Sequence, residues 1–131
     1  MIGLDINVLV RYIAQDDSRQ TAKAVDLIER RCDETRPGFI TAMVIAELVW
    51  VLESCYDSGK RDIVAILQRI LRTKQLAIES AETVWKAVRL FETSQADFAD
   101  CLIDRTAAAH ECEYTVTFDK GAAKAGMRLI E

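Results

Sequence analysis

Residues 95–112 read QADFADCLIDRTAAAHEC, a pattern that predicts a helix with an unusual acidic edge. Asp97, Asp100 and Asp104 recur at i, i+3 and i+7, which puts them on one stripe of that helix. Alanine-rich composition favours the helix, although like charges at this spacing repel one another. The helix dipole would explain an acid in the first turn, such as Asp97. The alternative is that at least one of these carboxylates faces a cation supplied from outside the helix.

Short apolar segments alternate with helical patterns on both sides of this stretch. The expected strands are IGLD (2–5), GFIT (38–41), LAIE (76–79), YTVTF (114–118) and MRLI (127–130). Helical patterns fill the intervals, at 7–15, 18–32, 42–56, 60–72, 81–93 and, as a short helix or turn, 120–126. Strands that alternate with helices are typical of a mainly parallel sheet, so the sequence predicts an α/β fold.

The composition excludes several classes of protein. With 17 basic and 21 acidic residues the net charge is -4, which argues against a mechanism that needs a globally basic surface. One histidine and the absence of a C-x-x-C pair argue against a zinc site. No secretory signal or membrane-spanning apolar run is evident, so we expect a cytoplasmic protein with reduced cysteines and no membrane association.

Several acids are expected at one edge of the sheet, because ligands of an open parallel sheet bind beyond the carboxyl ends of its strands. Asp5 ends the first expected strand, and Asp119 ends the fourth. Glu47 is the only charged residue between Arg36 and Glu53, in an apolar helix that we expect to be largely buried. Because a buried carboxylate without a cation is costly, a functional role for Glu47 is favoured over a position that points outward.

Together with Asp100, these acids are carboxylates from distant segments of the chain. Oxygen ligands of this kind suit hard cations, above all Mg²⁺ or Mn²⁺. The expected chemistry is metal-assisted hydrolysis of a phosphodiester, in which the metal lowers the pKa of a bound water. A metal would also neutralise acids that would otherwise repel a phosphate backbone.

Four motifs, IGLDINVLVRY, VIAELVWVL, DFADCLID and TVTFDK, occur in this order along the chain. Together they resemble the PIN-domain ribonucleases, specifically the VapC-type toxins of bacterial toxin–antitoxin pairs, over nearly its whole length. The resemblance implies a single PIN domain over residues 1–131, a three-layer α/β/α sandwich with a central, mainly parallel sheet of four to five strands. It also implies a Mg²⁺- or Mn²⁺-dependent endoribonuclease that cleaves RNA, and a homodimer held inactive by a cognate antitoxin.

The resemblance assigns roles to the four acids by their position in these motifs. Asp5 and Asp100 would be direct metal ligands. Glu47 and Asp119 would hold metal-bound waters or a second ion. All four would be catalytic.

Other residues near these motifs are accessory candidates. Asp97 lies where many family members also carry an acid, whereas Asp104 is outside the pattern and is expected in solvent. Ile6 stands where many members have Thr or Ser, so a hydroxyl is missing beside the first acid. Asn7 can still hydrogen-bond that acid. Thr117 could make a similar contact, or be an ordinary strand threonine.

Two other functions remain open at this point. A phosphatase of the haloacid dehalogenase type also uses a strand-end nucleophile, here Asp5, but it needs a second Asp where this chain has Asn7. A catalytically silent PIN module that binds RNA or a protein would predict missing acids, whereas all four are present.

Overall fold

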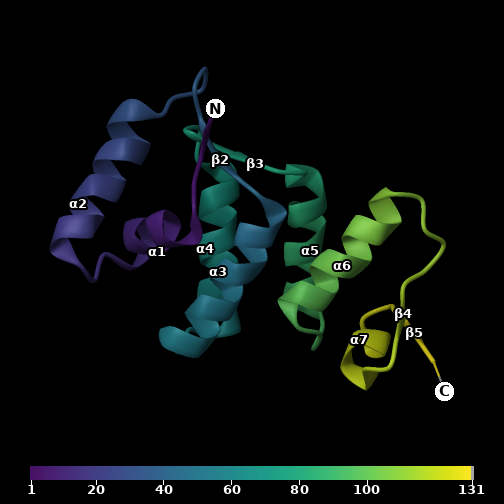
Figure 1. The fold of residues 1–131 in the computed structure, drawn as a ribbon. Helices are drawn as coiled ribbons and strands as arrows, with labels where there is room; N and C mark the ends of the chain where they lie inside the picture. Colours follow the sequence, from purple (N-terminus) through teal and green to yellow (C-terminus); the bar gives the residue numbers. More distant parts are fainter. Residues whose placement is uncertain (131) are drawn as a thin grey trace. The chain divides into compact units, whose positions relative to one another are not determined.

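The computed structural model describes residues 1–130, which form two compact units. Unit 1 comprises Met1–Glu79, and unit 2 begins at Ser80 (Figure 1). Unit 1 contains β1 (Ile2–Gly3), α1 (Ile6–Ala14), α2 (Ser18–Asp26), the π-helix η1 (Leu27–Arg31), β2 (Gly38–Ile40), α3 (Ala42–Cys55), α4 (Lys60–Arg72) and β3 (Leu76–Ile78). Unit 2 contains α5 (Ala81–Thr93), α6 (Phe98–Ala109), β4 (Val116–Thr117), α7 (Lys120–Lys124) and β5 (Arg128–Leu129).

All strand pairs in the described residues are parallel, as the sequence predicted. In unit 1 the strand order is β1-β2-β3, with Gly38 opposite both Ile2 and Leu76. In unit 2, β4 pairs with β5, and Val116 lies opposite Arg128. The predicted strands therefore form, shortened to two or three residues each, as a three-stranded and a two-stranded sheet. Within residues 1–130, no strand of one unit is hydrogen-bonded to a strand of the other, so the five strands do not form one continuous sheet.

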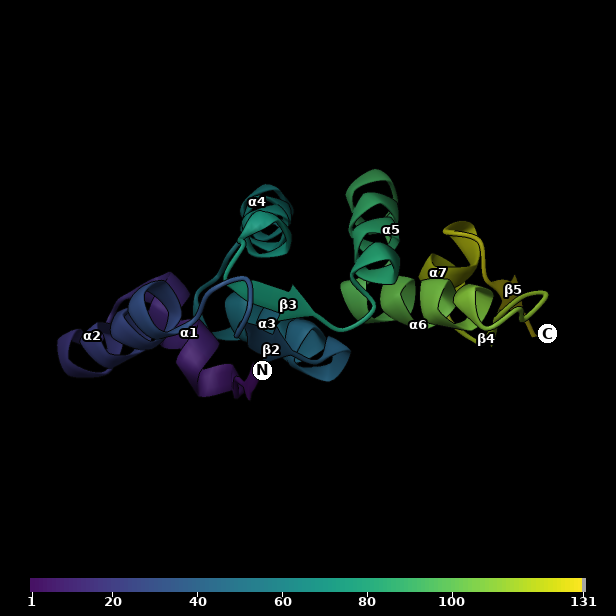
Figure 2. The same ribbon diagram turned by 90° about the horizontal axis from the view of Figure 1, so that it is seen from above.

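Helices cover the strands, which confirms the α/β class. In unit 1, α1 packs on α2 and α3, and α4 packs on β3. Figure 2 shows α4 on one side of these strands, with α1 and α3 on the other. In unit 2, α5 packs against α6, and α7 packs against β4 and β5.

Each unit buries its own apolar side chains. The most buried residues of unit 1 come from both helices and strands: Leu9, Ile28, Ile40, Ile45, Leu48, Ile63 and Leu67. Those of unit 2 are Val84, Ala87, Val88, Phe98, Cys101 and Ala122. The rings of Phe91 and Phe98 meet edge to face with centroids 5.7 Å apart, a favoured aromatic geometry.

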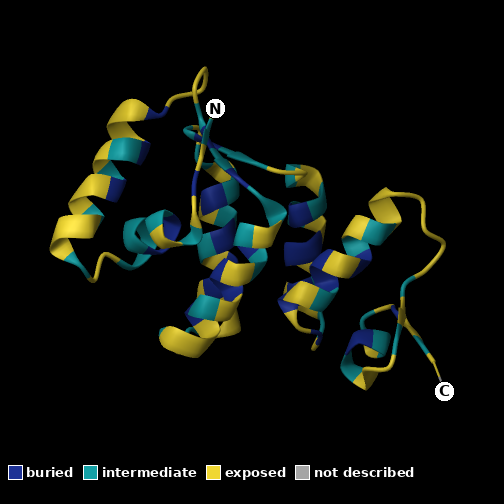
Figure 3. Cartoon of the chain, in the orientation of Figure 1, coloured by how far each residue is buried: buried dark blue, intermediate teal, exposed yellow. Residues whose placement is uncertain are grey.

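Helix α3 corrects one expectation, because it is not buried all round (Figure 3). Met43 and Trp50 are 74% and 64% exposed, and Glu47 between them is exposed as well. These residues follow i, i+4 and i+7 spacing, so they form one face of the helix. A helix that lies on one side of a sheet buries only the stripe that faces the sheet, and its other side chains stay exposed even when they are apolar.

Among residues 1–130, none of the helices combines the length and the hydropathy that a membrane span requires.

Capping residues set the starts of two helices where the sequence predicted them. The carboxylate of Asp17 accepts a hydrogen bond from the Gln20 amide at 3.0 Å, which begins α2. The hydroxyl of Thr41 accepts one from the Val44 amide at 3.1 Å, which begins α3. Each cap satisfies an amide that the helix itself leaves without a partner.

Gly38 provides a test of the packing around β2. A Cβ at this position would lie 2.7 Å from Leu4 Cδ1 and 3.3 Å from Leu76 Cδ2, both on buried side chains. We expect Gly38→Ala to lower the free energy of unfolding by about 1–3 kcal/mol, the usual cost of overpacking. Urea denaturation followed by circular dichroism measures this change.

Gly3→Ala in the neighbouring strand is the control, because no atom outside its own chain neighbours lies within 4 Å of the place that an alanine Cβ would take. We expect its free energy of unfolding to stay within about 1 kcal/mol of the wild type. Equal stability of the Gly38 variant and the wild type would contradict the tight contact between β2 and its neighbours.

Candidate active site

In unit 1, Asp5 lies where β1 leads into α1. The adjacent strands β1 and β2 are parallel, so the helices that follow them start at the same edge of the sheet. Asp5 is the N-cap residue of α1, and its carbonyl accepts a hydrogen bond from the Val8 amide at 3.1 Å. Its exposed carboxylate makes no capping hydrogen bond. The backbone of Asp5 therefore starts the helix while its side chain stays available to a ligand.

Glu47 lies in the second turn of α3, the helix that follows β2. Its side chain is exposed, so the argument that burial forces a function on this carboxylate is wrong. Exposure leaves Glu47 accessible to water and ions. Its role remains a prediction that rests on its position in the AEL motif.

Glu79 is a carboxylate at the same sheet edge that the sequence reasoning overlooked. It follows β3, and its Oε1 accepts a hydrogen bond from the Ala42 amide at 2.8 Å. It thereby satisfies a free amide at the start of α3, where the helix dipole favours an anion. The sequence carried the signal, because Glu79 ends an expected strand in the way Asp5 does. Its observed contact is structural.

In unit 2 the structure brings together Asp97, Asp100 and Asp119. Asp97 is the N-cap residue of α6 without a side-chain capping bond, and Asp100 lies in the first turn of the same helix. Asp119 is the N-cap residue of α7, and its Oδ2 accepts a hydrogen bond from the Ala122 amide at 2.9 Å. Partial burial, followed by the negative charges of Asp97 and Asp119, raises the pKa of Asp100. Asp97 and Asp119 therefore each lie close enough to Asp100 to disfavour its charged form.

Thr117 and Asn7 differ in what they contact. The Thr117 hydroxyl accepts a hydrogen bond from the Asp119 amide at 3.0 Å, so it helps to hold the backbone at that acid. Asn7 is exposed on the first turn of α1, and no hydrogen bond to Asp5 is found among residues 1–130. The accessory role thus has a structural basis for Thr117, whereas for Asn7 it stays a prediction.

Asp104 is not in solvent, so this expectation was wrong. It is 7% exposed, and its Oδ2 accepts hydrogen bonds from Arg105 Nη2 at 2.6 Å and Nε at 3.2 Å. Adjacent helical residues do not ordinarily face each other, and the long Arg105 side chain folds back to reach this carboxylate. The pairing neutralises a buried charge and separates Asp104 from the unpaired acids of the same helix.

The donor set fits a hard cation by its chemistry, because it consists of carboxylates. A cation near Asp100 would offset the repulsion that raises its pKa. Within residues 1–130, no three His, Cys, Asp or Glu side chains form a group that could hold a metal ion. Shared metal binding by Asp5 of unit 1 and Asp100 of unit 2 therefore stays a prediction.

Comparisons with known proteins identify the family to which this fold belongs. The chain is 27% identical over 131 residues to a protein of Aquifex aeolicus (strain VF5) named VapC ribonuclease, with 97% of this chain and 93% of that protein covered. The family model described as PIN domain matches residues 2–126, which include every candidate acid. The chain belongs to the PIN-domain family.

Proposed function

We propose that this chain is a divalent-metal-dependent endoribonuclease of the VapC type, in which both units form one PIN domain. The observation that carries the proposal is that Asp100 is half-buried at the start of α6, where burial and the negative charges of Asp97 and Asp119 raise its pKa. A fold retains such repulsion at a cost, which a bound cation would offset. Membership of the PIN family and the likeness to a protein named VapC ribonuclease support the same reaction class.

In the proposed site, Asp5 and Asp100 would hold Mg²⁺ or Mn²⁺. Glu47 and Asp119 would hold metal-bound water or a second ion, and Asp97 would add negative charge beside Asp100. The Thr117 hydroxyl fixes the backbone from which Asp119 extends. When bound, the cation would lower the pKa of water and stabilise negative charge on the phosphoryl oxygens. A binding module without catalysis is less well supported, because it has no need of uncompensated carboxylates.

The first test replaces each of the four acids by its amide. We expect Asp5→Asn, Glu47→Gln, Asp100→Asn and Asp119→Asn each to lower Mg²⁺-dependent cleavage of single-stranded RNA about 100-fold or more. This loss corresponds to several kcal/mol of metal-derived stabilisation. Single-turnover cleavage of an end-labelled RNA measures the rates.

Glu53→Gln is the matched control, because Glu53 is an exposed acid on the same helix as Glu47. Its cleavage rate should equal that of the wild type. If Asp100→Asn cleaves RNA as fast as the control, the metal assignment is refuted.

The second test uses the stability of the metal-free protein. The raised pKa means that folded Asp100 binds a proton more tightly than unfolded Asp100. Its contribution to stability is therefore lost as pH rises from the ordinary aspartate pKa through the raised pKa. In EDTA above that range, Asp100→Asn should melt at a higher temperature than the wild type, because one repelling charge is gone.

Added Mg²⁺ should reverse this order. A ligand that binds only the folded state raises its stability, so Mg²⁺ should raise the melting temperature of the wild type more than that of Asp100→Asn. Differential scanning calorimetry with and without Mg²⁺ measures both effects. Identical melting curves of the two proteins under both conditions would contradict a cation site at Asp100.

The third test concerns the biological role. We propose that the chain acts in the cytoplasm as the toxin of a toxin–antitoxin pair, as a homodimer that a cognate antitoxin inhibits. Expression alone should arrest bacterial growth, and co-expression of the small protein encoded beside it should restore growth. Asp100→Asn serves as the inactive control. Normal growth with the active protein would count against the toxin role and leave the nuclease untouched.

A further inference from the structure

A groove of about 380 Å³ runs between α1 and the continuous helix formed by α2 and η1 in unit 1. We call it the α1–α2 groove. Apolar side chains line part of it, namely Val8, Ala24 and Leu27. The polar lining consists of Asn7, Arg11, Gln20, Lys23 and Arg31. The groove therefore has cations in its lining and no acid.

Helical spacing explains why the cations share this groove. Lys23, Leu27 and Arg31 are separated by four residues each, so they follow one face of α2 and η1. Arg11 faces them from α1, which packs against α2. Basic side chains from two helices therefore line the same groove, although the net charge of the protein is -4.

Lys23 and Arg31 carry charge that the protein does not neutralise. Both are exposed, and neither forms an ion pair among residues 1–130. Two other cations of unit 1 are paired, because Arg30 lies 3.8 Å from Asp26 and Lys74 lies 3.9 Å from Glu34. The groove therefore carries at least two positive charges that no acid of the described chain neutralises.

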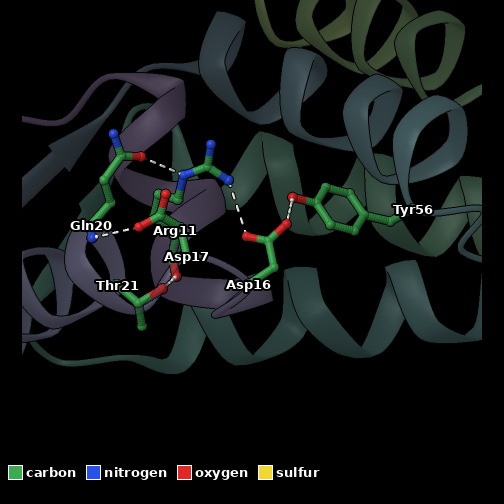
Figure 4. Close-up of polar contacts among 6 residues, drawn as sticks. All are labelled: Arg11, Asp16, Asp17, Gln20, Thr21 and Tyr56. Atoms are coloured by element: carbon green, nitrogen blue, oxygen red, sulfur yellow. Dashed lines mark hydrogen bonds and ion pairs between the residues drawn. The ribbon is translucent and has the colours of Figure 1, made fainter.

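Arg11, which lines the groove, is held in position by hydrogen bonds to Gln20 and Asp16 (Figure 4). Its Nε donates a hydrogen bond to Gln20 Oε1 at 2.6 Å, and its Nη1 donates one to Asp16 Oδ1 at 3.0 Å. Asp16 in turn accepts a hydrogen bond from the Tyr56 hydroxyl at 2.7 Å. The Nη2 group has no partner among the described residues. Arg11 is thus partly neutralised by Asp16 and keeps one donor for a ligand.

The groove begins beside a predicted metal ligand. Asn7 and Val8 line it, and they follow Asp5 by two and three residues. The Val8 amide donates a hydrogen bond to the Asp5 carbonyl at 3.1 Å, so this end of the groove is tied to the backbone of that acid. A strand whose scissile phosphate lies at Asp5 would reach these cations with its neighbouring nucleotides.

We propose that the α1–α2 groove binds backbone phosphates of the single-stranded RNA substrate next to the scissile bond, through Lys23, Arg31 and the Nη2 of Arg11. The inference rests on the proposed ribonuclease activity. A nuclease with an acidic centre and negative net charge needs local cations to bring a polyanion to it, and unpaired Lys and Arg release counterions when they bind phosphate. An acidic protein segment would fit the charge equally, but only RNA must pass Asp5.

The test measures RNA binding without catalysis. Fluorescence anisotropy of a labelled single-stranded oligoribonucleotide is recorded in EDTA over a series of salt concentrations, with the full chain. Lys23→Ala/Arg31→Ala is compared with Arg30→Ala/Lys74→Ala, which also removes two exposed cations of unit 1 but none from the groove. Melting temperatures of both variants verify that they fold.

Two lost phosphate contacts should make the slope of log K against log salt less steep by about 1.4, because each contributes about 0.7 on single strands. At 0.1 M salt this corresponds to about 25-fold weaker binding of the groove variant. The control variant should bind within about twofold of the wild type. Equal loss in both variants, or no RNA binding by the wild type, overturns the proposal.

Two further experiments distinguish this inference from the ribonuclease proposal and from binding of an acidic protein segment. If the wild type cleaves RNA with Mg²⁺ and the groove variant binds RNA normally, the groove assignment fails while the nuclease stands. If binding depends on the groove but no cleavage occurs, the nuclease fails while the groove stands. Poly-L-glutamate at equal charge concentration should not displace the RNA, and full displacement would reassign the groove to an acidic protein segment.

Discussion

Parallel strand pairing brings the starts of successive helices to one edge of a sheet. Parallel strands need a crossover connection, here made of helices, so the helices that follow neighbouring strands begin at the same edge. Asp5 follows β1 and Asp119 follows β4, and each is the N-cap residue of the next helix. Two of the four candidate ligands therefore lie where a strand leads into a helix, and Glu79 also follows a strand. The other two, Glu47 and Asp100, lie within α3 and α6.

Two acids on α6 differ in whether a neighbouring cation compensates their charge. Asp104 is buried but receives two hydrogen bonds from Arg105, so its charge is compensated within the helix. Asp100 lies one turn earlier without such a partner, and the charges of Asp97 and Asp119 add to the effect of burial on its pKa. The structure thus compensates the charge of Asp104 and leaves the charge of Asp100 uncompensated. Uncompensated, partly buried acids of this kind occur frequently at functional sites.

The same separation of charge occurs in unit 1. Arg30 and Lys74 pair with acids, whereas Lys23 and Arg31 form no ion pair among residues 1–130 and line the α1–α2 groove. Net charge therefore describes this groove poorly, because its lining includes cations and no acid. For a polyanionic substrate the local distribution matters more than the total, since exposed charges interact over about 10 Å at 0.1 M salt.

The order of strands and helices, their parallel arrangement and the acids at strand ends could be predicted from residue order, because periodicity and capping are local properties. The four motifs also sufficed to indicate the PIN family. Side-chain surroundings could not be predicted in this way. The exposure of Glu47 depends on which stripe of α3 meets the sheet, the burial of Asp104 depends on how Arg105 folds back, and the α1–α2 groove depends on two helices packing at one particular face. These are contacts between or around elements, and a linear pattern carries no information about which of several equally apolar faces will be covered.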